Sequence, residues 1–313
     1  MKPPEFTIRR LFEKLLGKEL MAYLLHLRPT EWPIMTAHFF LGTLLAKGWP
    51  AFSTGAVGVN GSLAAWTIFV VLMNGGTLAL NSAFDQDEGD IGYLKAPPKP
   101  PKYLAHFGFV LLAASLGWSM VFIRVKPGGH YFFEIVMTCV LLSILYSVPP
   151  IRLKARAGWD ILINCVGFGF FTPMAGWVFT GRGLEPVLMS LCIGFGLLFA
   201  ALYPLTQIYQ VEEDTQRGDQ TLVIRFGIGQ SLTYAIIATL SAHLWFAQAC
   251  IKAHANSLYL LISLAAWLGI LIPWRLRWQK ISAQQAESGM YRGLAAWAIT
   301  DISVLVLLWP KTP

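Results

Sequence analysis

Two clusters of acidic residues hold the side chains of this sequence that are best suited to chemistry. The first follows Asn81 and contains Asp85, Asp87, Glu88 and Asp90. Carboxylates packed this tightly repel one another, and they usually persist where a cation neutralises them. Carboxylate and carboxamide oxygens suit Mg²⁺, which proteins bind through one or two carboxylates together with substrate phosphates. The cluster therefore predicts a magnesium site with Asp85, Asp87 and Asp90 as ligands.

A solvated acidic loop is the alternative for this first cluster. Asn81 argues against it, because this carboxamide lies inside an apolar segment, where a polar side chain is costly and usually functional. Asn81 and Asp85 are four residues apart, so they share one face if the segment stays helical to its end. We therefore expect both residues to take part in the chemistry.

The second cluster contains Glu212, Glu213 and Asp214, with Asp219 five residues further on. Gln210 stands four residues before Asp214 and repeats the spacing of the first cluster. A charged loop with internal salt bridges is the alternative here. We expect Glu213 and Asp214 to hold a second Mg²⁺.

Arg152 and Lys154 supply the positive charge that a metal-bound diphosphate requires. Carboxylates hold the metal ion, and cations neutralise the remaining phosphate oxygens. Snorkelling of both side chains to lipid head groups is the alternative. The pair therefore predicts an anionic substrate if it lies at the same surface as the acidic clusters.

The elements that must position these residues are membrane-spanning helices. Hydrophobic residues make up 55% of the chain, charged residues 13%, and the mean hydropathy is +0.55. A soluble chain carries about 25% charged residues, so an ordinary soluble domain is excluded. A spanning helix needs about 20 mostly apolar residues. Nine segments are candidates: residues 33–45, 63–84, 104–123, 131–148, 161–179, 186–208, 232–251, 258–274 and 291–309.

The distribution of Lys and Arg predicts how these spans are oriented. With nine spans and a cytoplasmic N-terminus, 18 of the 24 Lys and Arg residues fall on the cytoplasmic side. Both acidic clusters and the Arg152–Lys154 segment fall on that side too. We expect a multi-pass protein of a bacterial inner membrane, with its N-terminus and the mouth of its site in the cytoplasm. Anionic lipids and an anionic substrate account for the net charge of +7, so no nucleic-acid partner is expected.

The domain organisation is simple. Residues 8–27 place Leu and Phe at helical spacing among basic residues, which indicates a helix lying on the membrane surface; a loosely ordered tail is the alternative. We therefore divide the chain into an amphipathic segment, residues 1–30, and one transmembrane domain, residues 31–313. No signal peptide is evident. The four cysteines form no CxxC pair, which argues against a thiolate metal site.

Three motifs together resemble the UbiA superfamily of intramembrane prenyltransferases. The Asn81–Asp90 region resembles the family's NDxxDxxxD, Tyr146-Ser-Val-Pro-Pro-Ile-Arg-Leu-Lys154 resembles YSxPPxRLK, and residues 210–227 resemble DxxxD followed by GxxTLxxRxG. The resemblance covers nearly the whole chain. It departs from the pattern at Ser82, at Gly89, where the last Asp is displaced to Asp90, and at Gln210. A proline-rich stretch also replaces the family's usual sequence after the first motif.

The resemblance implies an all-α fold of nine transmembrane helices around a central cavity that opens laterally to lipid. It implies Mg²⁺-dependent transfer of a prenyl group from a prenyl diphosphate to a lipophilic acceptor, for which we expect an aromatic compound. Asn81, Asp85 and Asp214 are then expected to be catalytic. The residues expected to bind substrate are Arg28, Tyr146, Arg152, Lys154 and Tyr209. Aromatic side chains that could stabilise a carbocation are Trp32, Phe84, Phe170, Phe171 and Tyr203.

Two other functions remain open. A terpene cyclase of the same fold would ionise the same diphosphate without an external acceptor. A multi-pass transporter or an inactive relative would also place charged residues within spans.

Polar residues inside spans are usually functional, and His38 in particular would either contact the acceptor or bond to another helix. The intramembrane polar residues are His38, Glu134, Asn164, His243 and Asp301.

Overall fold

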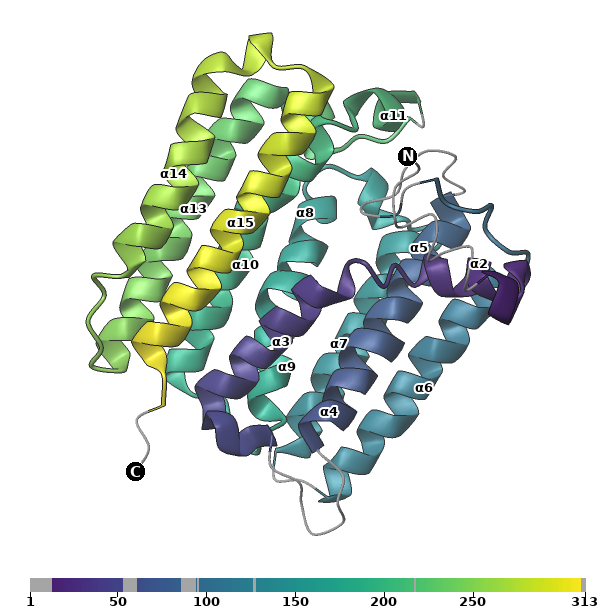
Figure 1. Cartoon of the computed structure of the whole chain (residues 1–313), viewed down its shortest axis with the longest axis horizontal. Coiled ribbons are helices and arrows are strands. Elements are labelled where there is room, and N and C mark those ends of the chain that lie inside the picture. The colour runs from purple at the N-terminus through teal and green to yellow at the C-terminus, as the bar shows by residue number, and fades with distance from the viewer. Residues whose placement is uncertain are drawn as a thin grey trace.

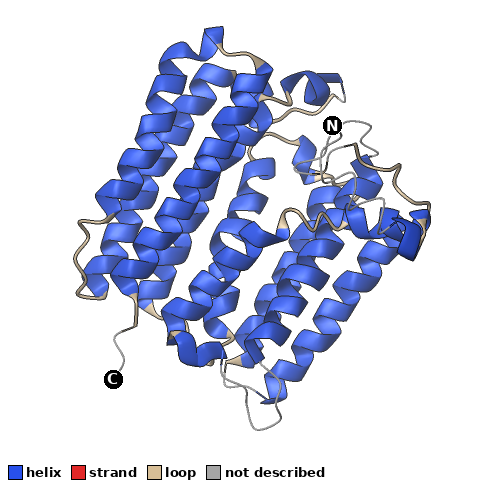
Figure 2. Cartoon of the chain, in the orientation of Figure 1, coloured by secondary structure: helices blue, strands red, loops and turns tan. Residues whose placement is uncertain are grey.

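The computed structural model describes residues 13–52, 61–85, 94, 96–125, 128–216 and 218–310. Within these ranges the chain is helical and contains no β-strand (Figure 2), and the β-bridge from Arg156 to Gln220 is isolated. The predicted all-α fold is therefore confirmed. The helices are α2 (Lys18–His26), α3 (Trp32–Lys47), α4 (Gly61–Trp66), α5 (Gly75–Asp85), α6 (Leu104–Val125), α7 (Gly129–Ser147), α8 (Trp159–Asn164), α9 (Thr172–Val178), α10 (Pro186–Ile208), α11 (Val211–Gln216), α12 (Leu222–Phe226), α13 (Ile228–Lys252), α14 (Leu260–Arg277) and α15 (Ala283–Leu308).

Eight continuous helical stretches of the described chain are long and apolar enough to cross a membrane. They correspond to eight of the nine predicted spans. The ninth, predicted at residues 33–45, is helix α3, which has only 16 residues. At 1.5 Å per residue α3 is about 24 Å long, shorter than a typical hydrocarbon core of about 30 Å. The chain is an integral multi-pass membrane protein.

Two spans change their helical geometry midway. Between α4 and α5 lies a π-helical stretch, η2 (Thr67–Asn74), and between α8 and α9 lies another, η4 (Cys165–Phe171). π-helical turns are rare and occur frequently at functional sites, because the wider turn redirects side chains. Here Asn74 of η2 and Phe168 of η4 both line the central cavity.

The helices pack closely through small residues, as is usual where lipid supplies no hydrophobic driving force. Helix α3 lies against α9, where Gly42 faces the carbonyl of Pro173 and Gly176 faces the carbonyl of Phe39. Helix α10 contacts α13, α15 and η4, and its Gly194 accommodates the ring of Phe246. In Figure 1, α10 and α13–α15 form one side of the bundle and α4–α7 the other, with α3 running between them.

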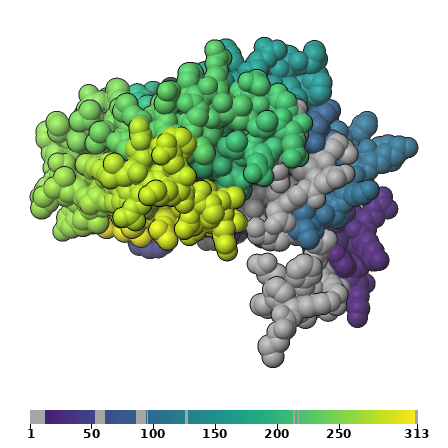
Figure 3. Space-filling model, turned by 90° about the horizontal axis from the view of Figure 1, so that it is seen from above, coloured from purple at the N-terminus to yellow at the C-terminus, as the bar shows by residue number. Residues whose placement is uncertain are grey.

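Residues 96–103, 148–158, 209–216, 218–227 and 278–282 lie between spans on one face of the bundle (Figure 1). This face, termed the mouth face, also carries the N-terminal helix α2, which packs on α5. Seen from above, N-terminal elements in purple and blue lie opposite C-terminal elements in green and yellow (Figure 3). Helix α2 confirms part of the helix predicted at residues 8–27, while residues 1–12 lie outside the described chain. Its place at a membrane surface and the division at residue 30 stay predictions.

Candidate active site

A cavity of about 370 Å³ opens at the mouth face and continues between the helices. Polar and charged side chains line its outer part, including Arg28, Asp85 and Lys154. Its inner part is lined by apolar side chains such as Met73 and Phe168. A cavity with one charged end and one apolar end suits an amphiphilic ligand.

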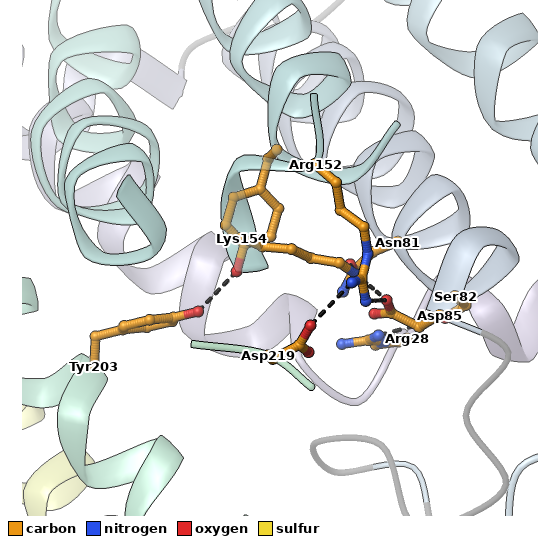
Figure 4. Close-up of polar contacts among 9 residues, drawn as sticks. Arg28, Asn81, Ser82, Asp85, Arg152, Lys154, Tyr203 and Asp219 are labelled. Atoms are coloured by element: carbon orange, nitrogen blue, oxygen red, sulfur yellow. Dashed lines mark hydrogen bonds and ion pairs between the residues drawn. The ribbon is translucent and has the colours of Figure 1, made fainter. Parts of the chain in front are cut away.

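The first motif and the basic pair meet at the charged end. Asp85 is the last residue of α5, and Asn81 stands one turn before it on the same helix. Lys154 Nζ donates to Asn81 Oδ1 at 2.6 Å and forms an ion pair with Asp85 Oδ1 (Figure 4). Arg152 Nη2 lies 3.2 Å from the same Asp85 oxygen. Residues about seventy positions apart in sequence thus form one ion-pair cluster.

The second motif joins this cluster through Asp219. Arg152 Nη1 donates to Asp219 Oδ1 at 2.9 Å, so one guanidinium joins Asp85 to the second motif. Asp214 is buried and lines the same cavity, as do Tyr209 and Gln210. The sequence places Asp219 in the second acidic cluster, as a residue that could supply a ligand missing from the family motif, but not as one of the main predicted ligands. Its position next to Gly218, which has φ +76° and allows a sharp turn, could have indicated that it folds back toward Asp214.

Arg28 enters the cavity from the segment before α3. Its backbone has φ +49°, and its Nη2 donates to Ser82 Oγ at 3.3 Å. Its Nη1 lies 3.6 Å from Glu31 Oε1. Burial raises the pKa of Glu31, and the charge of Arg28 opposes that rise. Ser82, which replaces an acidic residue of the family motif, is thus a neutral partner that leaves more of the charge of Arg28 for an anion.

Some predicted metal ligands fall outside the described chain. Asp87 and Asp90 lie there, as does Glu88, and the side chain of Glu213 in α11 is likewise not described. Within the described ranges, no group of three His, Cys, Asp or Glu side chains forms a metal site by itself. The carboxylates of Asp85, Asp214 and Asp219 nevertheless line one cavity. This donor set, beside three cations, fits a metal ion that binds together with phosphate oxygens.

Asp160 is a buried carboxylate that the sequence reasoning missed. Its Oδ1 accepts from the backbone N–H of Gly158 at 2.8 Å, and its Oδ2 accepts from Gln207 Nε2 at 2.7 Å. Oδ2 also lies 3.4 Å from the N–H of Leu222. Asp160 therefore fixes the segment after Asp219 to α8 and α10. An acidic residue at the start of an apolar span was its available signal.

The aromatic lining differs from the prediction. Of the five expected side chains only Tyr203 lines the cavity, where its hydroxyl lies 2.7 Å from that of Tyr146. The other four candidates, Trp32, Phe84, Phe170 and Phe171, are not among the residues that line the cavity. Phe168 and Phe199 take that place, and their rings stack with centroids 5.5 Å apart.

The intramembrane polar residues divide into two kinds. His38 lines the cavity, with its Nδ1 3.6 Å from Asp301 Oδ1 on α15 and its Nε2 3.4 Å from the carbonyl of Gly169. Asn164 also lines the cavity. His243 instead bonds to Ser263 across two helices, and Glu134 is exposed.

Comparison with known proteins gives the same fold. The family model of the UbiA prenyltransferase family matches residues 24–297. A UbiA homolog from Archaeoglobus fulgidus bound to DMAPP and Mg²⁺ superposes with a TM-score of 0.66, 17% identity, and coverage of 91% of this chain and 99% of that one. The same homolog bound to GPP and Mg²⁺ superposes with a TM-score of 0.64 and 16% identity, over 91% of this chain and 100% of that one.

A third solved structure concerns digeranylgeranylglyceryl phosphate synthase. It superposes with a TM-score of 0.66 and 18% identity over 93% of this chain and 99% of that one. No curated protein matches the chain significantly. At these identities the solved structures establish the fold, and the family model, which spans most of the sequence, establishes the relationship. This chain belongs to the UbiA prenyltransferase family.

Proposed function

We propose that this chain transfers a prenyl group from a prenyl diphosphate to a lipophilic, aromatic acceptor in a Mg²⁺-dependent reaction. One observation carries the proposal. Carboxylates from both acidic motifs and three cations converge at the charged end of a cavity whose other end is apolar. A diphosphate with a hydrocarbon tail has the same division of charge along its length. The similar structures of the Archaeoglobus fulgidus homolog, bound to Mg²⁺ with DMAPP or GPP, also support this substrate class.

The carboxylates are assigned to the metal. Asp85 and Asp214 are the proposed ligands among the described side chains, and Asp219 lies within the same cluster. Asp87, Asp90 and Glu213 stay as further predicted ligands. When bound, Mg²⁺ supplies positive charge that stabilises the leaving diphosphate. Arg152 and Lys154 hold the carboxylate of Asp85 at the mouth of the cavity.

The cations are assigned to the diphosphate. Arg28, Arg152 and Lys154 present N–H groups to the same end of the cavity, and guanidinium groups bind phosphate oxygens through paired hydrogen bonds. In the reaction the bond between the allylic carbon and the bridging oxygen breaks. The diphosphate leaves with the electron pair, the acceptor attacks the allylic carbon, and a proton leaves the acceptor. Neutralising the departing charge lowers the barrier to the first of these events.

The inner cavity is assigned to the hydrocarbon chain and the developing cation. Phe168, Phe199 and Tyr203 form a run of rings along one wall, with the Phe199 and Tyr203 centroids 6.1 Å apart. Aromatic faces attract a nearby cation, most strongly where water is excluded. Tyr146 and Tyr209 also line the cavity and are further proposed substrate contacts, while Asn81 positions Lys154 and Asp85.

The test is diphosphate release from labelled farnesyl and geranylgeranyl diphosphate in membranes that contain the protein. Release should require Mg²⁺ and should fall about 10³-fold in Asp85→Asn, since a metal ligand contributes several kcal/mol to transition-state stabilisation. Glu134→Gln is the matched control, because this carboxylate is exposed and does not line the cavity. Near-normal release by Asp85→Asn would show that the metal site is wrongly assigned. No release with any acceptor from a panel of lipophilic phenols would refute the transferase.

A further inference from the structure

A second cavity, of about 340 Å³, lies in the hairpin between α14 and α15. It is lined by the last turns of α14, the connecting segment and the first turns of α15. This hairpin connects its two spans on the mouth face, as the residues around Arg152 do for theirs. The two cavities are distinct, because no residue lines both.

Three cations converge on this second cavity. Arg277 comes from α14, Lys280 from the turn and Arg292 from α15, and all three side chains are exposed. No ion pair joins any of them to a carboxylate of the described chain. Glu287 is the nearest acidic residue in sequence on α15, and it does not line the cavity. Cations gathered without a counter-charge create a positive potential that attracts anions.

Hydrogen-bond donors accompany this charge. Gln285 and Ser288 line the cavity from the first turns of α15. The start of this 26-residue helix is fixed by a capping box, in which Ser282 Oγ accepts from the N–H of Gln285 at 3.3 Å. The helix dipole adds partial positive charge at the same end. Cationic and hydroxyl donors together suit a phosphate group.

The remaining wall of the cavity is apolar and lies deeper along α14. Ile270, Pro273 and Trp274 form this wall. They stand three to seven residues before Arg277, which places them about 4 to 10 Å from it along the helix axis. The ring of Trp274 packs against Gly289 of α15, where an added Cβ would overlap the ring. The hairpin is therefore closed at this level. Outside it, Ile272 and Leu276 are 43% and 77% exposed.

We propose that this hairpin binds the head group of an anionic phospholipid from the leaflet at the mouth face. The cations and Ser288 hold the phosphate at the membrane edge, and the acyl chains lie along the exposed face of α14. Along α14 the cationic end lies at the membrane edge and the apolar residues lie deeper, in the same order as the head group and acyl chains of a lipid. Basic pockets between transmembrane helices are suited to anionic head groups, because each cation near the surface adds to the attraction. The proposal does not depend on the prenyl-transfer reaction.

Native mass spectrometry of the full-length protein in detergent tests this assignment. The protein is titrated with phosphatidylglycerol and with phosphatidylcholine of the same acyl chains. We expect retention of phosphatidylglycerol to exceed that of phosphatidylcholine by at least about tenfold. The triple variant Arg277→Gln, Lys280→Gln, Arg292→Gln should lose this preference, and Arg292→Gln alone should lose part of it.

A matched control removes the same charge elsewhere. Lys14, Lys99 and Lys102 are exposed and line neither cavity, so replacing all three by Gln should leave the lipid preference unchanged. Equal retention of both lipids by the wild-type protein would overturn the proposal. An equal loss of preference in the control would overturn it too, since net charge would then explain the binding. Displacement of phosphatidylglycerol by geranylgeranyl diphosphate at the hairpin would reassign the cavity to the soluble anion.

Discussion

Lys154 is the side chain on which the candidate site depends most directly. It is 9% exposed and contacts both Asn81 and Asp85. The carboxylate of Asp85 is itself mostly buried, so water alone does not compensate its charge and Lys154 neutralises it. Removing one partner from a buried hydrogen-bonded charge pair typically costs about 2–5 kcal/mol. We therefore expect Lys154→Met to lower kcat/KM for the prenyl diphosphate at least about 30-fold.

A kinetic comparison separates binding from folding in that experiment. Lys154→Arg keeps the charge and should retain more activity than Lys154→Met, although the guanidinium is planar and larger. Both variants should give monodisperse protein at the wild-type yield. Equal kcat/KM for Lys154→Met and wild type would mean that this ammonium group does not touch the substrate or its carboxylate partners.

His38 and Asp301 form a polar pair between two spans, and their contribution to stability is measurable. Among the described residues, His38 Nδ1 and Asp301 Oδ1 have no hydrogen-bond partner, and they lie 3.6 Å from each other. A buried polar atom without a partner costs about 1–3 kcal/mol, whereas replacing both partners by apolar groups is much less costly. We expect Asp301→Leu to lower the thermal midpoint in detergent and the added substitution His38→Leu to restore part of it. Additive losses would show that the two side chains do not interact.

At the residue scale, the sequence predicted the site well where a motif joins charge to spacing. Asp85, Arg152 and Lys154 were expected at one surface, and both cations form ion pairs with Asp85. Asp160 was missed because its partners, Gln207 and Leu222, are about fifty and sixty residues away, and no local pattern shows such contacts. Whether the contacting residues act on a substrate stays a prediction.

Helices α3 and α9 approach each other more closely than any side chain would allow. A Cβ added at Gly42 would overlap the carbonyl oxygen of Pro173. The Cβ is fixed to one helix backbone and the oxygen belongs to the other, so neither can rotate away. Overpacking costs about 1–3 kcal/mol and more where backbone must move. We expect Gly42→Ala to lower the thermal midpoint and the yield of folded protein.

The matched control for Gly42 is Gly117 in α6, which is exposed and has open space where a Cβ would be added. Gly117→Ala should be neutral or slightly stabilising, because alanine is favoured over glycine within helices by about 0.5–1 kcal/mol. A similar loss in both variants would indicate a general intolerance of α-helical substitutions. A neutral Gly42→Ala would contradict the close contact itself.

Helix α2 should be held in place in a pH-dependent manner through His26. Its Nε2 donates to the carbonyl of Pro98 at 3.0 Å, while its Nδ1 is buried without a partner among the described residues. Burial lowers the pKa of His26 below its usual 6.5, and the charge of Arg28 lowers it further, against the opposing effect of the Pro98 bond. A group whose pKa is depressed by folding stabilises the folded form above its unfolded pKa and loses that effect as pH falls.

Hydrogen exchange measures this effect locally. After correction for intrinsic rates, residues 18–26 should be less protected at pH 5.5 than at pH 7.5. Gln can donate to the Pro98 carbonyl but does not titrate, so His26→Gln should remove most of the difference between the two pH values. If the wild-type helix is equally protected at both pH values, protonation of His26 does not oppose its docking.

At the element scale, hydropathy located the spans because lipid requires about 20 apolar residues in a row. It predicted a short first span at residues 33–45, and α3 is short, with 16 residues, but it did not predict that two spans would contain π-helical stretches. Hydropathy could not show them, because a run of apolar residues reads the same whether its helix is α or π. Within η4, Phe168 lines the cavity, whereas Phe170 and Phe171 do not.

The whole molecule separates charge from hydrocarbon along one direction. The ion-pair cluster around Arg152 and the three cations of the α14–α15 hairpin both lie on the mouth face, while the apolar part of the central cavity extends away from it. A membrane holds its lipid phosphates and its hydrocarbon in the same order. A substrate with an anionic head and a prenyl tail would therefore enter without turning over.

The excess of Lys and Arg on the mouth face predicts how the whole molecule is oriented in the membrane. We expect the mouth face to be cytoplasmic. Cysteine labelling tests it, since Cys139, Cys192 and Cys250 are buried and Cys165 is half-buried. Two exposed positions serve as reporters: Lys102, before α6 on the mouth face, and Ser257, between α13 and α14 on the opposite face.

A membrane-impermeant maleimide should label Ser257→Cys in intact bacterial cells and Lys102→Cys only after the cells are opened. The unmodified protein, with its four native cysteines, gives the background. Labelling of Lys102→Cys in intact cells would place the diphosphate end of the cavity outside the cytoplasm. That result would contradict the positive-inside rule, which puts a face this rich in Lys and Arg in the cytoplasm. Because soluble prenyl diphosphates could then reach the site only from that side, the same result would also change which leaflet supplies the substrate.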